Sequence, residues 1–318
     1  MCEQTDQCQR YNNLLKEGFV SGIKKGWSGF IWMLKIIIPV SFLTALLAWS
    51  CWLNKIDFFV KPVMTLLNLP AMAALPLIIG MFSNLYGAIA AMSVLTFTNE
   101  QMTLIAIFLL IAHNLIQEGI IQARSGMHPM KATLFRLVAA VITVTLVAQF
   151  FDATALTPVT SEAPTQVSQP FVYILKSWSF VIFYLCIKIF AIIMSILILL
   201  EIMKSLGWIN HIVRLLTPVL KILGLRQNVG ILWVTAAVFG LSYGGAVIVE
   251  EVKEGRLTKD ELEDLHLSIG INHSLIEDPS LFLALGLSAF WLWIPRLIMA
   301  MIAVRLLNLW HLVRKKRQ

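Results

Sequence analysis

The stretch DLHLSIGINHSLIEDPSLFLALG, residues 264–286, decides the fold. Its flanks are apolar enough for a membrane-spanning helix. Its middle is polar and ends in a helix breaker: His273, Ser274, Glu277, Asp278 and Pro279. An ionisable side chain at bilayer depth costs roughly 2.5–3.5 kcal/mol on insertion scales. We therefore expect these groups to be satisfied inside the protein, either as a binding site or as a structural network.

A second copy of this pattern lies upstream as TLIAIFLLIAHNLIQEGIIQARSG, residues 103–126. There the polar positions hold His113, Asn114, Gln117 and Glu118. Positions four apart share one face of a continuous helix. In both copies we expect each histidine to share a face with the residue four positions later.

Composition indicates a polytopic α-helical membrane protein. Of the 318 residues, 58% are hydrophobic and only 14% are charged, whereas soluble domains carry about 25% charged residues. The mean hydropathy is +0.79. Long continuous apolar runs favour helices over a barrel. The net charge of +7 reflects basic residues near helix ends, which orient spans in the bilayer. The expected partner is therefore the lipid bilayer and not nucleic acid.

The chain divides into two similar halves joined by a linker rich in Pro, Ser and Thr. PVMTLLNL (62–69) matches PVLKILGL (218–225), and Arg136 matches Arg296. We interpret both arginines as anchors at cytoplasmic helix ends. The expected division is a cytoplasmic tail (1–26), a first repeat (27–151), an external linker (152–170), a second repeat (171–310) and a basic cytoplasmic tail (311–318).

The distribution of positive charge predicts the topology. The basic segments, including both termini, are placed in the cytoplasm. Residues 70–95 and 228–249 have polar, Gly-bearing centres and are expected to be re-entrant hairpins. Each half then contains three spans, so the second half is inverted relative to the first. The predicted fold is an all-α polytopic membrane protein with an inverted-topology repeat, about six transmembrane helices and two re-entrant hairpins.

Three motifs carry a resemblance to a known family: FGLSYGGAVIVEE (239–251), EGRLTKDELED (254–264) and SIGINHSLIEDP (268–279). They resemble the nucleoside recognition (Gate) family, which is related to concentrative nucleoside transporters, the Gate segments of the ferrous-iron permease FeoB, and spore maturation proteins A and B. The resemblance implies two fused Gate repeats in a bacterial inner (cytoplasmic) membrane protein. It also implies a nucleoside-like solute and a homo-oligomer.

The candidate substrate-binding residues come from the two polar helix centres and the two hairpin centres. They are His113, Asn114, Gln117, Glu118, His273, Ser274, Glu277, Asp278, Asn84, Tyr86, Ser242, Tyr243 and Gly244. Lys35 and Lys188 are possible charge partners of the acids. The competing interpretation is structural: a satisfied polar network, small residues that allow close helix packing, and lysines that snorkel to an interface.

The expected function is a secondary transporter or permease for a small polar solute, with H⁺ or Na⁺ as a possible coupling ion. A first alternative is a divalent-metal permease, because imidazole and carboxylate groups suit Zn, Fe or Mn. Its ligands would come from His113, Glu118, His273, Glu277 and Asp278. A second alternative is a non-transporting component of a larger assembly that docks through the charged loop 250–264. The sequence has no HExxH or phosphate-loop motif, and its one match to G-x-S-x-G, GLSYG at 240–244, lies at the centre of the expected second hairpin. We expect no catalytic residues and no enzyme.

Overall fold

The computed structural model describes residues 2–50, 52–152, 156, 170–208, 211, 214–216, 218, 220, 223–225, 229–255 and 257–316. Within these ranges, side chains are not described at residues 2–8, 52–57, 239, 241–243, 246 and 314–316. Most of the expected linker 152–170 therefore lies outside the described residues. Parts of residues 204–226, one of the basic segments placed in the cytoplasm, also lie outside the described residues, as do the side chains of the basic run at the C-terminus.

Helices form all the regular structure in the described part of the chain. The first half contains α1 (Cys2–Trp49), α2 (Trp52–Leu66), η1 (Ala71–Ala73), α3 (Ala74–Phe82), α4 (Leu85–Val94), α5 (Asn99–Ala112), α6 (Leu115–Arg124) and α7 (Pro129–Ala148). The second half contains α9 (Phe171–Ser205), α11 (Gly230–Phe239), α12 (Leu241–Lys253), α13 (Lys259–Asn272), α14 (Glu277–Leu283) and α15 (Ala289–Lys316). Within the described residues, α3 to α7 of the first half correspond in order to α11 to α15 of the second half.

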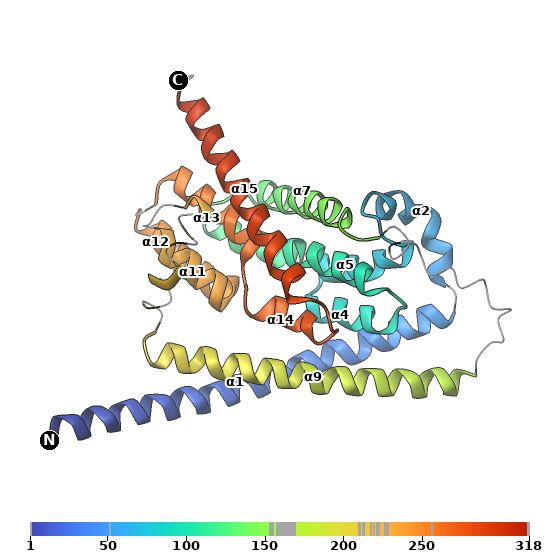
Figure 1. The fold of residues 1–318 in the computed structure, drawn as a ribbon, viewed down its shortest axis with the longest axis horizontal. Helices are drawn as coiled ribbons and strands as arrows, with labels where there is room; N and C mark the ends of the chain where they lie inside the picture. The colour runs from blue at the N-terminus through green and yellow to red at the C-terminus, as the bar shows by residue number, and fades with distance from the viewer. Residues whose placement is uncertain are drawn as a thin grey trace.

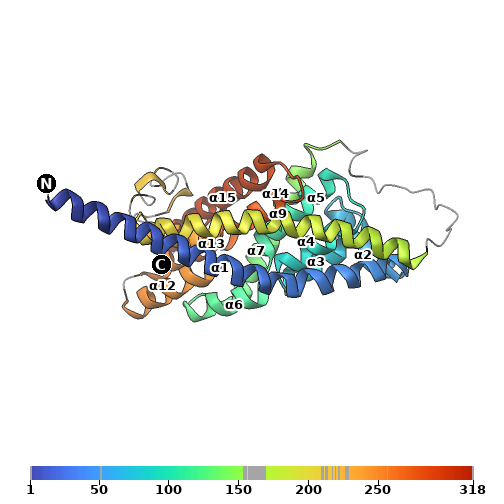
Figure 2. The ribbon, with the colours of Figure 1, turned by 90° about the horizontal axis from the view of Figure 1, so that it is seen from below.

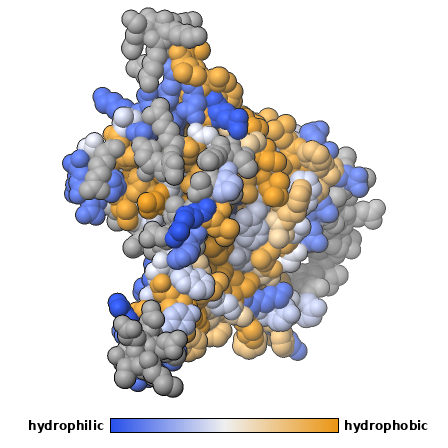
Figure 3. Space-filling model, turned by 60° about the vertical axis from the view of Figure 1, so that its left-hand side comes forward, coloured by the Kyte–Doolittle hydropathy of each residue, from blue (hydrophilic) through white to orange (hydrophobic). Residues whose placement is uncertain are grey.

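The helices are long and apolar enough for a multi-span membrane protein. Within the described residues, five helices are long and apolar enough to cross a membrane. Counting the bent pair Phe58–Leu66 and Ala71–Phe82 as one further span gives six. Hydrophobic residues cover a broad part of the face in Figure 3. The all-α polytopic fold is thus confirmed. Two expected spans are each divided between two helices: the stretch 103–126 between α5 and α6, and the stretch 264–286 between α13 and the short α14.

The long helices α1 and α9 lie side by side and run in opposite directions, as Figures 1 and 2 show. Gly22 of α1 lies against Ile198 of α9, and near the other end Trp49 packs on Phe171 at 5.5 Å between ring centroids. Residue numbers rise along α1 as they fall along α9. Because α1 and α9 are the first helices of the two halves, this antiparallel pair shows that the halves are inverted.

Glycines spaced four residues apart allow α1 to approach α9 closely. A Cβ on Gly18 would lie 2.8 Å from the Ile202 Cα, and one on Gly22 would lie 2.5 Å from the Ile198 Cα. Small residues at this spacing let membrane helices pack backbone to backbone. The structure also differs from the expected tail: residues 2–26 are helical and continue directly into the first span, and Gly18 and Gly22 of this segment pack on α9.

Two short helix pairs fold back on themselves. Gly244 of α12 lies against Ala236 of α11, and Gly80 of α3 lies near Ala88 of α4, where an added Cβ would meet the Ala88 Cβ at 3.2 Å. Residues eight apart in a continuous helix would be about 12 Å apart along its axis. Segments 70–95 and 229–249 therefore have the folded-back conformation expected of hairpins. The side from which each enters the bilayer remains a prediction.

The repeated segments 62–69 and 218–225 share a turn geometry. Asn68 and Gly224 are both left-handed, with φ 55° and 80°. The amide of Leu69 donates to Met64 O at 2.9 Å, and the amide of Leu225 donates to Leu220 O at 3.1 Å. This left-handed turn with its return hydrogen bond is a common helix ending. The sequence repeat thus corresponds to a repeat in backbone conformation.

Gly22→Ala is expected to lower the free energy of unfolding by about 1–3 kcal/mol, the usual cost of overpacking. Gly29→Ala is the matched control, because its Cβ would meet only the Leu197 Cδ1 at 4.0 Å. Alanine is also the better helix former, so the control should unfold at the same or a higher temperature. Thermal unfolding in detergent measures both. Equal melting temperatures for the two variants would contradict the packing of α1 on α9.

Candidate metal and solute site

Equivalent helix breaks lie at the centre of the two halves. After α5 and α13 end, His113 (φ −92°, ψ 168°) and His273 (φ −71°, ψ 161°) are extended. The next residues, Asn114 and Ser274, are left-handed, with φ 48° and 47°. A left-handed residue other than glycine is uncommon, and such strain is concentrated at functional sites. Finding it at matching positions of both halves makes these breaks the candidate site.

The breaks overturn the expectation of a shared helical face. The helix is interrupted directly after each histidine. The residue four positions later therefore belongs to the next helix, α6 or α14, and shares no helical face with the histidine. The acids that approach the histidines lie five positions later instead: Glu118 after His113, and Asp278 after His273.

The amide groups at each break are satisfied by the neighbouring hairpin. The Asn114 amide donates to Gly80 O of α3 at 3.0 Å. The Ser274 amide donates to Ala236 O of α11 at 3.3 Å. Unpaired backbone groups inside a bilayer are costly, so irregular backbone there needs protein partners. The hairpins therefore support the broken helices directly.

Two buried arginines satisfy the carbonyl groups at the breaks. From α7, Arg136 donates through Nε to Ile111 O and through Nη2 to His113 O, both at 2.8 Å. From α15, Arg296 donates through Nη2 to Ile271 O at 2.9 Å and to His273 O at 3.1 Å. Each guanidinium thus binds the same two carbonyl positions of its own half.

The interpretation of Arg136 and Arg296 as cytoplasmic anchors was wrong. They are 1% and 0% exposed, respectively. A guanidinium has several donors in a rigid fork, which matches neighbouring carbonyls left free by a helix end. A sequence signal existed, because each arginine follows the histidine of its own half by 23 residues.

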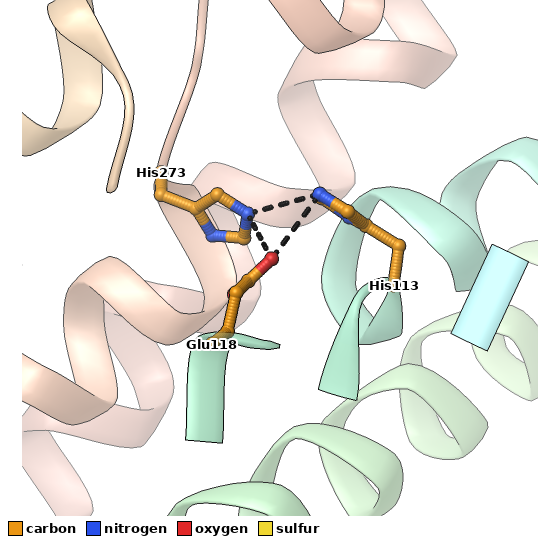
Figure 4. Close-up of side chains that lie close together, drawn as sticks. All are labelled: His113, Glu118 and His273. Atoms are coloured by element: carbon orange, nitrogen blue, oxygen red, sulfur yellow. Dashed lines mark hydrogen bonds and ion pairs between the residues drawn. The ribbon is translucent and has the colours of Figure 1, made fainter. Parts of the chain in front are cut away.

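The two histidines meet across the halves through the nitrogen edges of their rings, which are tilted by 40° with their centroids 4.8 Å apart (Figure 4). Nδ1 of His113 lies 2.7 Å from Leu109 O, and Nδ1 of His273 lies 3.0 Å from Ile269 O. Their Nε2 atoms are 3.2 Å apart. Oε1 of Glu118 lies 3.3 Å from the Nε2 of His113 and 3.1 Å from that of His273. All three side chains are buried.

The two acids differ in their other partners. Oε2 of Glu118 forms an ion pair with Nη1 of Arg136 at 2.7 Å, which leaves Oε1 directed at the histidines. Oδ2 of Asp278 lies 3.4 Å from Nε2 of His113 and 3.9 Å from that of His273. This oxygen is buried and has no hydrogen-bond donor. Both carboxylates are thus available to a group placed between the histidines.

A cavity of about 320 Å³ adjoins this cluster. Its wall comes from both halves and extends from the buried histidines to the partly exposed Trp32 of α1. The candidate site residues that line it are Asn84, Tyr86, His113, Asn114, Gln117, Glu118, His273, Ser274, Glu277 and Asp278. A cavity of this size is at the lower end of the usual range for small-molecule sites.

Two cavity residues, Tyr86 and Asn84, form hydrogen bonds with other parts of the protein. The hydroxyl of Tyr86 donates to Oε1 of Glu277 at 3.3 Å, across the halves. Asn84 caps helix α4, because its Oδ1 accepts from the Gly87 amide at 2.9 Å. Glu277 therefore lies on the cavity wall beside Tyr86.

Gly244, Lys188 and Lys35 do not line this cavity. Gly244 packs against Ala236, and the side chains of Ser242 and Tyr243 are outside the described residues. Lys188 donates to Ala284 O at 3.2 Å, and its Nζ lies 4.6 Å from the centre of the Tyr184 ring. Lys35 is exposed.

Arg136→Leu is expected to lower the free energy of unfolding by about 3–5 kcal/mol, the usual cost of leaving a buried charge without its partner. It would strand the Glu118 carboxylate and two carbonyl groups. Arg124→Leu is the control, since Arg124 is exposed and surface substitutions change stability by about 0.5 kcal/mol or less. Urea or thermal unfolding in detergent compares them. A stable Arg136→Leu protein would contradict the role given to the arginines.

No protein-family model and no solved structure matches this chain. Among curated proteins, it is similar to the "Uncharacterized membrane protein YvoD" of Bacillus subtilis (strain 168). The two are 25% identical over 295 residues, which cover 91% of this chain and 93% of that protein. The chain is a multi-span helical membrane protein with distant homology to this bacterial membrane protein.

Proposed function

We propose that the protein is a permease that moves a small polar solute or ion across the bacterial cytoplasmic membrane. The observation that carries this proposal is the cavity lined by the helix breaks of both inverted halves. Broken helices that meet near the midplane of inverted repeats are the usual arrangement of secondary-transporter sites. Movement of one half against the other would then expose the same site to each side in turn.

The cavity chemistry favours a cation or a solute rich in hydrogen-bond donors. The acceptors gathered there are Nε2 of the two histidines and the carboxylates of Glu118, Glu277 and Asp278. The C-terminal ends of α5 and α13 also meet at the cluster and carry partial negative charge. A proton or Na⁺ is the coupling ion that fits the buried carboxylates.

The Gate resemblance supports the same proposal. It suggests two fused Gate repeats, a nucleoside-like solute, a homo-oligomer and cytoplasmic termini. We favour transport over docking to a partner, because the loop 250–264 uses Thr258 and Glu261 in a capping box that begins α13. Glu263 in this loop also pairs with Lys131. We likewise propose transport and not catalysis.

Purified protein in liposomes should take up [³H]uridine or ⁵⁴Mn²⁺ above the level of protein-free vesicles. Asp278→Asn and Glu277→Gln should each reduce this uptake at least 10-fold, because both remove a cavity carboxylate charge. Glu17→Gln, at an exposed position of α1, should leave it unchanged. The permease proposal would be overturned if folded wild-type protein moved neither probe, or if both cavity variants transported normally.

A further inference from the structure

We propose that His113, His273, Glu118 and Asp278 directly coordinate one divalent transition-metal cation, of the Zn²⁺, Fe²⁺ and Mn²⁺ class. Coordination stands on the side-chain geometry alone. The statement that this metal is the transported substrate rests on the proposed function.

The first argument is the orientation of the imidazole rings. A carbonyl oxygen only accepts hydrogen bonds, so contact with Leu109 O and Ile269 O places a proton on Nδ1 of each histidine. In the neutral ring, Nε2 then carries a lone pair. Metal-binding histidines are commonly held in this way, with the other ring nitrogen donating to a carbonyl. Both rings are therefore prepared to bind through Nε2.

The second argument is the convergence of acceptors. The two Nε2 atoms and Oε1 of Glu118 form a triangle with sides of 3.1, 3.2 and 3.3 Å. None of the three atoms carries a hydrogen when the rings are neutral and the carboxylate is ionised. Three lone-pair groups at this distance repel one another unless a cation lies among them. The buried position removes water as a screen.

The third argument is the size of the triangle. A tetrahedral metal with ligand distances of about 2.0–2.1 Å has ligand–ligand distances of about 3.3–3.4 Å. The three sides fall within 0.3 Å of this range. Oδ2 of Asp278, at 3.4 Å and 3.9 Å from the histidine nitrogens, is placed to complete four ligands after a small shift.

The surroundings also fit a metal site. Arg136 binds the second oxygen of Glu118 at 2.7 Å, which fixes the direction of Oε1 as outer partners do for metal ligands. Imidazole with carboxylate suits Zn²⁺, Fe²⁺ or Mn²⁺ better than Ca²⁺ or Mg²⁺, which prefer all-oxygen sets. Glu277, an expected ligand, is instead directed to Tyr86.

The competing occupant is a proton. One histidine could be doubly protonated and donate from Nε2 to Glu118, which would make the cluster a proton site and a part of ion coupling. Metal binding distinguishes the two, because a proton site has no reason to take Zn²⁺ or Co²⁺ stoichiometrically.

The test is titration of metal-stripped, purified protein with Zn²⁺, followed by calorimetry and by metal analysis after gel filtration. We expect one Zn²⁺ per chain. Removing a partner of a metal ligand costs about 10–100-fold in affinity, so His273→Ala and Glu118→Gln, which remove ligands, should weaken binding on the order of 100-fold or more. His128→Ala, at an exposed histidine, is the matched control that should retain it.

Folding failure of the ligand variants does not leave the proposal untested. Wild-type protein loaded with Co²⁺ should show the strong visible absorption of four-coordinate Co²⁺, and X-ray absorption of the Zn²⁺ form should show N/O ligands near 2.0–2.1 Å. Absence of stoichiometric binding, or binding unaffected by His273→Ala, would overturn metal coordination. Stoichiometric binding without ⁵⁴Mn²⁺ or ⁶⁵Zn²⁺ uptake would overturn the statement that the metal is the transported substrate and leave the metal site standing.

Discussion

The structure depends on one constraint: backbone groups at an interrupted helix cannot be left unpaired in the membrane interior. Each break frees carbonyl and amide groups in the buried centre of the protein, where they need protein partners. Arg136 and Arg296 bind the carbonyls, and the hairpin helices α3 and α11 accept from the amides. The elements around the centre are thus linked by the need to satisfy two breaks.

The same constraint positions the chemistry. The extended conformation of each histidine turns its ring back along its own helix, where Nδ1 meets a carbonyl four residues earlier. The inverted halves then bring the two Nε2 atoms together, and Arg136 orients Glu118 toward them. A buried ion pair is weak evidence for stability. Here the ion pair between Arg136 and Glu118 is better understood as orienting Oε1 of Glu118 toward the two histidines.

Much of the fold could be predicted from the sequence. Hydropathy identified a polytopic helical protein, and the repeated motifs identified two halves with polar centres. The polar residues of both centres do line one cavity. Local patterns could not show that the helices break directly after His113 and His273, because left-handed Asn114 and Ser274 depend on tertiary partners. The expectation that each histidine faces the residue four positions later was therefore wrong, and the nearest acids are Glu118 and Asp278, five positions later.

Two further features were present in the sequence but misread. An arginine in an apolar run resembles an interfacial anchor unless its spacing from the histidine is compared between halves. The glycines at positions 18, 22 and 26 lie in a polar segment, which concealed their role in helix packing. Both cases show that the charge and polarity of a segment do not reveal its contacts. The arginines bind buried backbone carbonyls, and the glycines let two helix backbones pack closely.

A density map of the purified protein, prepared with Zn²⁺, tests the central claim most directly. The account predicts one density peak between the two imidazole rings, within bonding distance of His113, His273 and Glu118, and therefore shared by both halves. A map showing the rings bonded only to protein groups, with no bound species and no cavity joining the halves, would contradict it and leave the cluster a structural network.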